Sequence, residues 1–222
     1  MEPPVRGPVA FIGLMATGKS VVGAQLASRL GWSFIDTDQL IVARHGRISR
    51  IFSQQGEQAF RRLEARVVAE VLAEASAETV VSLGGGAVLD EGTQALLAGA
   101  RVVFLDADLA TVRRRITRDR SRPLLAGDPV EAWTRMDRER RPVYERLADI
   151  VLDTRGHSID QLVTELSTQL QNPHDKLHNS ELHNRKLHNR KLHNRKLHNS
   201  ELYNRKLHNS ELYNNEGDSH GE

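Results

Sequence analysis

The stretch GLMATGKS, Gly13 to Ser20, is the most informative part of this sequence. An apolar run, Val9 to Ile12, comes directly before it, and a helical pattern, Ser20 to Leu30, comes directly after it. Strand, glycine-rich loop and helix in this order, with the spacing G-x-x-x-x-G-K-[ST], predict a phosphate-binding P-loop. Glycines let the backbone curl so that its N–H groups point at phosphate oxygens, and the helix N-terminus adds partial positive charge there.

The side chains of this loop predict a nucleotide that is bound together with Mg²⁺. We expect Lys19 to reach the outer phosphates and the Ser20 hydroxyl to be a ligand of the metal ion. The nucleotide-binding residues expected in and beside the loop are Gly13, Ala16, Thr17, Gly18, Lys19, Ser20 and Val21.

Residues 1–171 read as one α/β domain, because apolar runs alternate with amphipathic segments. The predicted strands are Val9–Ile12, Ser33–Asp36, Thr79–Leu83, Val102–Leu105 and Ile150–Leu152. The predicted helices are Ser20–Leu30, Asp38–His45, Glu57–Ala75, Gly92–Leu97, Leu109–Thr117, Pro129–Leu147 and Ser158–Leu170. We expect Gly31 to end the first helix and Asp128 to cap the helix that starts at Pro129. Alternating strands and helices predict a parallel sheet covered on both faces, with ligands beyond the carboxyl ends of its strands.

Residues 172–222 form a tail built on a five-residue repeat such as KLHNS and KLHNR. A period of five fits neither helix nor strand, so we predict a disordered, low-complexity segment. A pentapeptide β-helix is the ordered alternative, but it would bury arginines such as Arg185 and Arg190 at great cost. The tail's histidines could also bind transition metals.

The composition favours a cytoplasmic protein that is not a nucleic-acid or membrane binder. The sequence has no cysteine and no apolar run long enough to span a bilayer, and we see no secretory signal at its start. The formal net charge of +2 arises in residues 171–222, which hold nine Lys/Arg and seven Asp/Glu. The remainder is balanced in charge, so nothing in it indicates nucleic-acid binding.

Two aspartates follow the second predicted strand in the sequence FIDTD. Asp36 and Asp38 lie two residues apart, so on a strand they would project to the same side. One carboxylate can hold Mg²⁺ and the other can bind a substrate hydroxyl. For Asp38, capping of the next helix is the competing interpretation.

Two further motifs lie at the same predicted edge of the sheet. In QAFRRLE, Arg61 could grip a carboxylate through two parallel bonds, or it could simply pair with Glu64 on a solvated helix face. The glycines Gly84–Gly86 follow a buried strand and would let a ligand approach the backbone closely, unless they form a plain flexible turn.

The arginine-dense connection Arg118 to Asp128 predicts a lid over the site. Arg122, next to Pro123, is the residue expected to neutralise charge on the transferred phosphoryl group. The following helix carries Arg138, Arg140 and Arg141, which we expect to face the lid.

These motifs, in this order, resemble the shikimate kinase family over residues 7–170. They are the P-loop GLMATGKS, DTD, FRRLE, GGGAV, RPLL and R-x-P-x-Y. The resemblance implies a three-layer αβα P-loop kinase fold with a five-stranded parallel sheet and a helical lid. It also implies ATP- and Mg²⁺-dependent phosphorylation of the 3-hydroxyl of shikimate, on the route to chorismate and the aromatic amino acids. We expect the protein to be a monomer.

The resemblance also implies a role for each matched residue. Lys19, Ser20 and Asp36 would serve the phosphates and Mg²⁺, and Asp38 would bind the shikimate hydroxyls and accept the proton. The substrate-binding residues implied are Asp38, Arg61, Gly84, Gly85, Gly86 and Arg140. Arg122 would be the lid arginine, and Arg115 would stack on adenine.

Two other functions remain open at this point. A gluconate kinase of the same fold would also recognise a carboxylate and hydroxyls. A non-catalytic ligand-sensing module should carry a DNA-binding segment or a damaged P-loop, and this sequence shows neither.

Overall fold

The structure is a computed structural model that describes residues 7–118, 123–125 and 127–171 of the 222-residue chain. The predictions for Arg122 and for the tail 172–222 lie outside these described residues. Within the described residues, strands and helices alternate along the chain, as the sequence predicts for an α/β fold.

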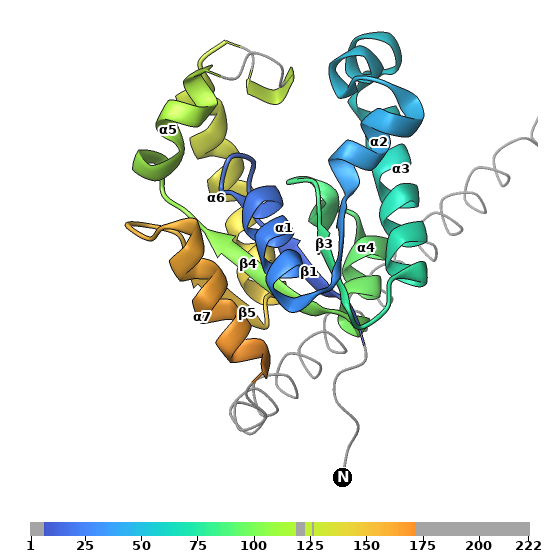
Figure 1. Cartoon of the computed structure of the whole chain (residues 1–222). Helices are drawn as coiled ribbons and strands as arrows, with labels where there is room; N and C mark the ends of the chain where they lie inside the picture. Colours follow the sequence, from blue (N-terminus) through green and yellow to red (C-terminus); the bar gives the residue numbers. More distant parts are fainter. Residues whose placement is uncertain (1–6, 119–122, 126, 172–222) are drawn as a thin grey trace, which may run out of the picture. The chain divides into compact units, whose positions relative to one another are not determined.

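A parallel sheet forms the centre of the fold (Figure 1). Its strands are β1 (Val9–Ile12), β2 (Ser33–Asp36), β3 (Thr79–Ser82), β4 (Arg101–Asp106) and β5 (Ile150–Asp153). They lie in the order β2-β3-β1-β4-β5, and every neighbouring pair is parallel. The five strands match the predicted ones to within one residue at each end. Because β1 is the middle strand, the P-loop that comes after it begins at the centre of the carboxyl edge.

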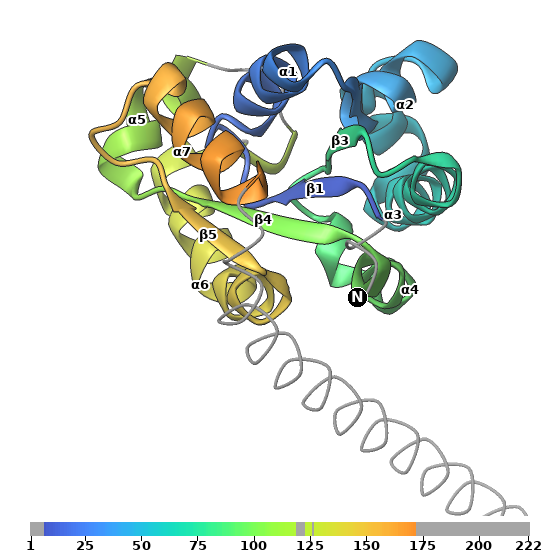
Figure 2. The ribbon, with the colours of Figure 1, turned by 60° about the horizontal axis from the view of Figure 1, so that its bottom comes forward.

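Helices connect the strands and cover both faces of the sheet. They are α1 (Lys19–Leu30), α2 (Thr37–His45), α3 (Ile48–Glu74), α4 (Glu91–Leu96), α5 (Leu109–Arg118), α6 (Pro129–Leu147) and α7 (Ile159–Gln171). Short 3₁₀ turns are η1 (Ala87–Leu89), η2 (Leu97–Gly99) and η3 (Pro123–Leu125). Figure 2 shows α1 and α7 on one side of the sheet and α4 and α6 on the other.

The strands alternate their side chains between two buried clusters. Val9 and Phe11 of β1 face the cluster that includes Leu26 of α1 and Val163 of α7. Ala10 and Ile12 face the larger cluster, which includes residues of α3, α5 and α6 such as Val68 of α3. This alternation confirms the predicted three-layer αβα arrangement.

Two helix ends form as the sequence predicts. Gly31 ends α1 in the left-handed conformation (φ 69°), and its backbone N–H donates to the carbonyls of Ala27 and Ser28. The carboxylate of Asp128 accepts hydrogen bonds from the N–H groups of Val130 (2.8 Å) and Glu131 (3.1 Å), with Pro129 in the first turn of α6.

The predicted helix Glu57–Ala75 corresponds to the part of α3 after Gly56, but the sequence does not predict the helical segment from Ile48 that precedes it. The helical backbone of α3 is interrupted only at Gly56 (φ 81°, ψ 169°). The helical turns before Gly56 are stabilised by packing across the kink, because the ring centroids of Phe52 and Phe60 lie 4.8 Å apart. A contact between side chains on the two sides of a kink produces no clear helical periodicity in the sequence of so short a segment.

Figure 1 also shows how the helices frame the P-loop, with α5 and α6 on one side of it and α2 and α3 on the other. In the described part of the chain, no helix combines the length and the apolar character that a membrane span requires.

Candidate functional site

The P-loop between β1 and α1 has the strained backbone that its sequence predicts. Gly13 (φ 134°) and Gly18 (φ 104°) both lie in the region that favours glycine. A Cβ at Gly13 would lie 2.8 Å from the backbone oxygen of Leu105, so a side chain there would push β1 and β4 apart. Ala16 also has a positive φ of 68°, which is uncommon for a residue with a side chain. Such local strain is often found where a backbone is shaped around a ligand.

Lys19 runs back along the loop from the first turn of α1. Its ammonium group donates hydrogen bonds to the carbonyls of Gly13 and Leu14, both at 2.8 Å. The Thr17 hydroxyl also donates to the carbonyl of Leu14, at 2.9 Å. The lysine charge is therefore held inside the curl of the loop, where phosphate groups would lie.

Ser20 and Asp36 form the candidate metal site. The Ser20 hydroxyl donates to Asp36 Oδ2 at 2.5 Å, and Asp36 Oδ1 accepts from the N–H of Gln39 at 3.1 Å. Asp36 therefore caps α2 and presents a carboxylate oxygen beside the P-loop hydroxyl. Hard oxygen donors of this kind fit Mg²⁺, which usually keeps several waters and takes one or two protein ligands.

The expectation that Asp36 and Asp38 share one side of a strand is wrong. β2 ends at Asp36 and α2 begins at Thr37, so Asp38 lies in the first turn of a helix. Asp36 rather than Asp38 is the capping residue, which removes the competing interpretation for Asp38. Asp38 still reaches the site, because it lines two neighbouring cavities, one around the P-loop and one beside the turn after β3.

The cavity around the P-loop has a volume of about 390 Å³. The loop residues from Met15 to Val22 line one part of it, together with Asp38. The other part is lined by Thr111 and Arg115 of α5 and by Thr154 and His157 of the loop after β5. Arg115 is fixed to the P-loop, because its Nη1 donates to the Ala16 carbonyl at 2.8 Å. This cavity contains every predicted nucleotide-binding residue in the described part of the chain except Gly13.

A second cavity, of about 780 Å³, lies between α2, α3, α6 and the turn after β3. Its polar lining includes Asp38, Arg47, Arg61, Glu64 and Arg140, and its apolar lining includes Phe52 and Phe60. The two cavities share Met15, Asp38 and Gly85. A ligand in one would therefore meet a ligand in the other at these three residues.

Arg61 enters the second cavity from α3. Its Nη1 donates to Glu64 Oε2 at 2.7 Å and its Nη2 to Glu57 Oε1 at 3.0 Å. The guanidinium lies against Gly86, where any Cβ would collide with it. The predicted pair with Glu64 is present, but it lines a cavity and is not part of a solvated face.

Glu64 is a site residue that the sequence reasoning missed. Glu64 is 2% exposed, and its carboxylate is turned toward Arg61 and Gly84. Burial raises the pKa of Glu64, and the nearby Arg61 charge opposes that rise. A glutamate next to an arginine on a helix is common at surfaces, so only the tertiary structure reveals this burial.

Arg140 and Tyr144 of α6 hold the glycine turn. The Gly85 carbonyl accepts a hydrogen bond from Arg140 Nη1 at 3.2 Å and from the Tyr144 hydroxyl at 2.5 Å. The Tyr144 ring stacks on Phe104 at 5.2 Å, and burial raises the pKa of its hydroxyl. The hydroxyl therefore stays a donor throughout the neutral pH range.

The expectation that three arginines of α6 face the same side is wrong. Arg140 is buried and lines the second cavity, whereas Arg138 is exposed. Arg141 instead contacts Asp137 and Asp106, with 2.8 Å between its Nη2 and Asp106 Oδ1. Successive residues on a helix point about 100° apart, so Arg138 and Arg140 lie on nearly opposite sides and the three arginines cannot all face the cavity.

The helix α6 also contacts the P-loop. The indole of Trp133 donates to the Met15 carbonyl at 3.3 Å. This contact was not predicted, because the hydrogen-bonding partner of a buried tryptophan cannot be read from its position in the sequence.

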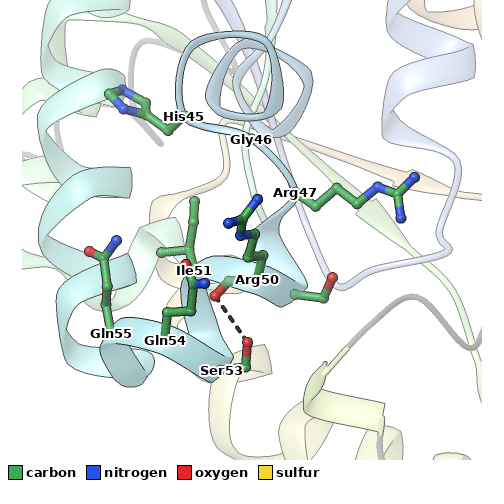
Figure 3. Close-up of a pocket in the computed structure, with 9 residues that line it drawn as sticks. His45, Gly46, Arg47, Arg50, Ile51, Ser53, Gln54 and Gln55 are labelled. Carbon is green, nitrogen blue, oxygen red and sulfur yellow. Dashed lines mark hydrogen bonds between the residues drawn. The ribbon is translucent and has the colours of Figure 1, made fainter.

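A third cavity, of about 780 Å³, lies at the junction of α2 and α3 (Figure 3). It is lined by residues from His45 to Gln55 and meets the second cavity at Arg47 and Ser49. The bond drawn between its lining residues joins the Ser53 hydroxyl to the Arg50 carbonyl, at 3.1 Å. Its lining contains none of the residues that the sequence predicts for the site.

Comparisons with known proteins agree with the sequence motifs. A family model described as shikimate kinase matches residues 15–171. The shikimate kinase of Thermobifida fusca (strain YX) is 44% identical over 166 residues, which cover 74% of this chain and 95% of that protein. The shikimate kinase of Streptomyces coelicolor is 44% identical over 155 residues, 69% of this chain and 90% of that protein.

Solved structures show the same fold. Shikimate kinase from Acinetobacter baumannii in complex with shikimate is similar with a TM-score of 0.70 and 30% identity, over 74% of this chain and 92% of that one. A gluconokinase from Sinorhizobium meliloti 1021 is similar with a TM-score of 0.54 and 19% identity, over 76% of this chain and 93% of that one. The gluconokinase likeness shows the fold alone.

Proposed function

The chain belongs to the shikimate kinase family, and from this premise we propose that its two joined cavities bring the γ-phosphate of ATP to the 3-hydroxyl of shikimate. The chain is a phosphotransferase of aromatic amino acid biosynthesis. The single observation that supports the assignment of the two cavities is that they meet at Met15, Asp38 and Gly85. We also propose that the enzyme is a monomer. We further propose that it works in the cytoplasm, where ATP is available.

ATP would bind in the cavity around the P-loop. The backbone N–H groups of the loop and the ammonium of Lys19 would hold its outer phosphates, and Arg115 would lie beside its base. Ser20 and Asp36 would hold Mg²⁺, which neutralises charge on the phosphate oxygens when it is bound. On the sequence motif alone, we also propose that the lid residue Arg122 neutralises charge on the transferred phosphoryl group.

Shikimate would bind in the second cavity. Arg61 and Arg140 enter it from different helices, and two guanidinium groups suit one carboxylate. Asp38 lies where the two cavities meet, so it can orient the acceptor hydroxyl and take its proton. Gly84–Gly86 let the ring approach the backbone, since side chains at Gly84 and Gly86 would collide with Glu64, Asp38 and Arg61.

The reaction that this arrangement supports is direct in-line transfer. The acceptor oxygen forms a bond to the γ-phosphorus while the bond to the leaving ADP breaks, and the hydroxyl proton passes to Asp38. Positioning and charge stabilisation supply most of the acceleration in reactions of this kind.

The test is turnover with ATP and either shikimate or gluconate at equal concentration, followed by ADP release and by mass spectrometry of the product. We expect a phosphorylated product from shikimate and little from gluconate. Absence of shikimate turnover in protein that binds ATP would contradict the proposal, and preference for gluconate would support the second kinase class.

A further inference from the structure

Asp106, the last residue of β4, lies at the carboxyl edge of the sheet and contacts two other parts of the molecule. The residue is 8% exposed, so its carboxylate is largely removed from water. Its Oδ1 lies 2.8 Å from Arg141 Nη2 of α6, and its Oδ2 lies 3.5 Å from Arg155 Nη2 in the loop after β5. One carboxylate therefore joins α6 and this loop to the same strand.

Each of these arginines also pairs with a carboxylate close to it in the sequence. Arg155 pairs with Asp153, two residues before it, at 2.7 Å, and Arg141 pairs with Asp137, four residues before it in α6, at 3.2 Å. A pair within one helix or one short loop cannot fix that element against the rest of the molecule. Among the described residues, Asp106 is the carboxylate that lies within 4.0 Å of both arginines.

The loop after β5, residues 154–158, forms part of the wall of the cavity around the P-loop. Thr154 and His157 line this cavity. The Asp106 carbonyl accepts two hydrogen bonds from Thr154, from its N–H at 2.9 Å and from its hydroxyl at 2.8 Å. The ion pair with Arg155 adds a side-chain contact one residue further along. Asp106 therefore holds the start of this loop through both its main chain and its side chain.

The contact with Arg141 holds α6 at the position from which it reaches the second cavity. Arg141 comes directly after Arg140, which lines that cavity and donates to the Gly85 carbonyl. Pro142 follows, and because it has no N–H, α6 lacks one backbone hydrogen bond at this point. An anchor between Arg141 and the sheet therefore has a direct effect on where Arg140 lies.

Stability alone is a weak reason for a charged group in this place. The cost of removing a carboxylate and a guanidinium from water largely cancels their attraction, and apolar residues of similar volume often stabilise a fold as well or better. A charged pair does fix an orientation, because its groups must stay in contact to offset that cost. The contacts of Asp106 therefore fit a residue that positions its neighbours.

We propose that Asp106 is a positioning residue for both halves of the site. It holds the loop after β5 beside the nucleotide, and through Arg141 it holds Arg140 beside the acceptor. This inference rests on the proposed function. Asp106 lines neither cavity, so it acts through its neighbours and takes no part in the bonds that form and break.

The test is the KM for ATP and the KM for shikimate in Asp106→Asn, Arg155→Gln and Arg141→Gln. Asparagine keeps the size of Asp106 and removes its charge. We expect both KM values to rise in Asp106→Asn, the KM for ATP alone in Arg155→Gln and the KM for shikimate alone in Arg141→Gln. The shikimate effect should be several-fold and the ATP effect smaller, because the Arg155 pair is longer and its side chain is 48% exposed.

A double variant shows whether Asp106 acts on the nucleotide through Arg155. In Asp106→Asn combined with Arg155→Gln, the KM for ATP should be no higher than in Asp106→Asn alone, because both substitutions remove the same contact. Independent effects of the two substitutions on this KM would multiply, and that result would contradict the contact as the route.

Asp153→Asn and Asp137→Asn are the matched controls. Each removes the other carboxylate that pairs with one of the two arginines and leaves the contacts of Asp106 in place. Neither residue lines the cavity around the P-loop or the second cavity. We expect both KM values to equal those of wild type. Unfolding midpoints of all variants separate a general loss of stability from a loss of positioning.

The outcomes separate the two levels of the proposal. A lower unfolding midpoint with unchanged KM values in Asp106→Asn would show a structural role only and overturn the inference, as would a rise in one KM alone. If Asp106→Asn does not fold, the arginine variants carry the test, and wild-type KM values in both would overturn the inference. Wild-type protein without shikimate turnover would instead contradict the proposed function.

Discussion

At the scale of single residues, Gly85 joins the two halves of the site. Its carbonyl accepts hydrogen bonds from Arg140 and Tyr144, and its Cα lies so near the P-loop that an added Cβ would be 3.3 Å from the Met15 nitrogen. The position of the turn therefore depends on α6 on one side and on the P-loop on the other. Movement of this one peptide would disturb both cavities.

Tyr144→Phe tests whether the hydroxyl positions this turn. The variant keeps the ring that stacks on Phe104 and removes the bond of 2.5 Å to Gly85. We expect the free energy of unfolding to fall by about 1–3 kcal/mol, because a buried carbonyl loses a partner. The KM for shikimate should rise several-fold and the KM for ATP should change little. Equal KM values for shikimate in variant and wild type would show that Arg140 alone holds the turn.

At the scale of secondary-structure elements, the kink in α3 shapes the second cavity, in which we propose that the acceptor binds. We call it the acceptor cavity. The segment before Gly56 supplies Ile48 and Phe52 to its wall, and the segment after it supplies Phe60 and Arg61. The two segments can face one cavity only because the helix turns at Gly56, where φ is 81°. A residue with a side chain is disfavoured in that conformation.

Gly56→Ala is therefore expected to weaken acceptor binding. Gly31→Ala is the matched control, because Gly31 also has a positive φ (69°) and nothing lies within 4 Å of an added Cβ at either glycine. Both variants should lose about 1 kcal/mol of unfolding free energy or more, measured by denaturant titration. Only Gly56→Ala should raise the KM for shikimate, since Gly31 ends α1 and lines neither cavity. The same KM for shikimate in both variants would mean that the kink does not determine the shape of the acceptor cavity.

Elements with a strong local signal could be predicted from the sequence. The strands, the helices α1 and α6 and the caps at Gly31 and Asp128 follow from apolar runs, glycine and proline positions. The start of α3 could not, because Ile48–Gln55 becomes helical through its contact with Phe60 across the kink. Local patterns carry little information about a contact that depends on a turn of the chain.

The site shows the same division. The P-loop residues, Asp36, Asp38, Arg61 and Arg140 are the ones that the motifs predict. Asp38, Arg61, Arg140 and the loop residues from Met15 to Ser20 line the joined cavities, whereas Gly13 and Asp36 do not, although Asp36 accepts a hydrogen bond from Ser20. Glu64 is named from the sequence only as a partner of Arg61, and Tyr144 only as part of a motif, because the burial of Glu64 and the bond from Tyr144 to Gly85 depend on the tertiary structure. Asp36 and Asp38 both reach the site, but not because they project from one side of a strand. The strand β2 ends at Asp36, so Asp38 lies beyond it.

At the scale of the whole molecule, the described residues that line the site all precede the tail. The residues that line the two cavities lie between Met15 and Leu162, and the family match ends at residue 171. Nothing in the proposed chemistry uses residues 172–222, whose disorder remains a prediction from the repeat.

Deletion of residues 173–222 should therefore leave kcat and both KM values unchanged within error. The measurement is steady-state turnover of the full chain and the shortened chain under identical conditions. A large loss of turnover in the shortened chain, with an unchanged unfolding midpoint, would show that the tail acts on the site.

The variant Arg61→Lys shows whether an acidic acceptor is held by a guanidinium fork next to the P-loop. Lysine keeps the charge but loses the two parallel donors, so the KM for shikimate should rise by about tenfold or more while the KM for ATP stays the same. The exposed neighbour Arg62, changed to lysine in the same way, should leave both values as in wild type. A shikimate KM that is equal in wild type, Arg61→Lys and Arg62→Lys would show that the Arg61 fork does not hold the acceptor.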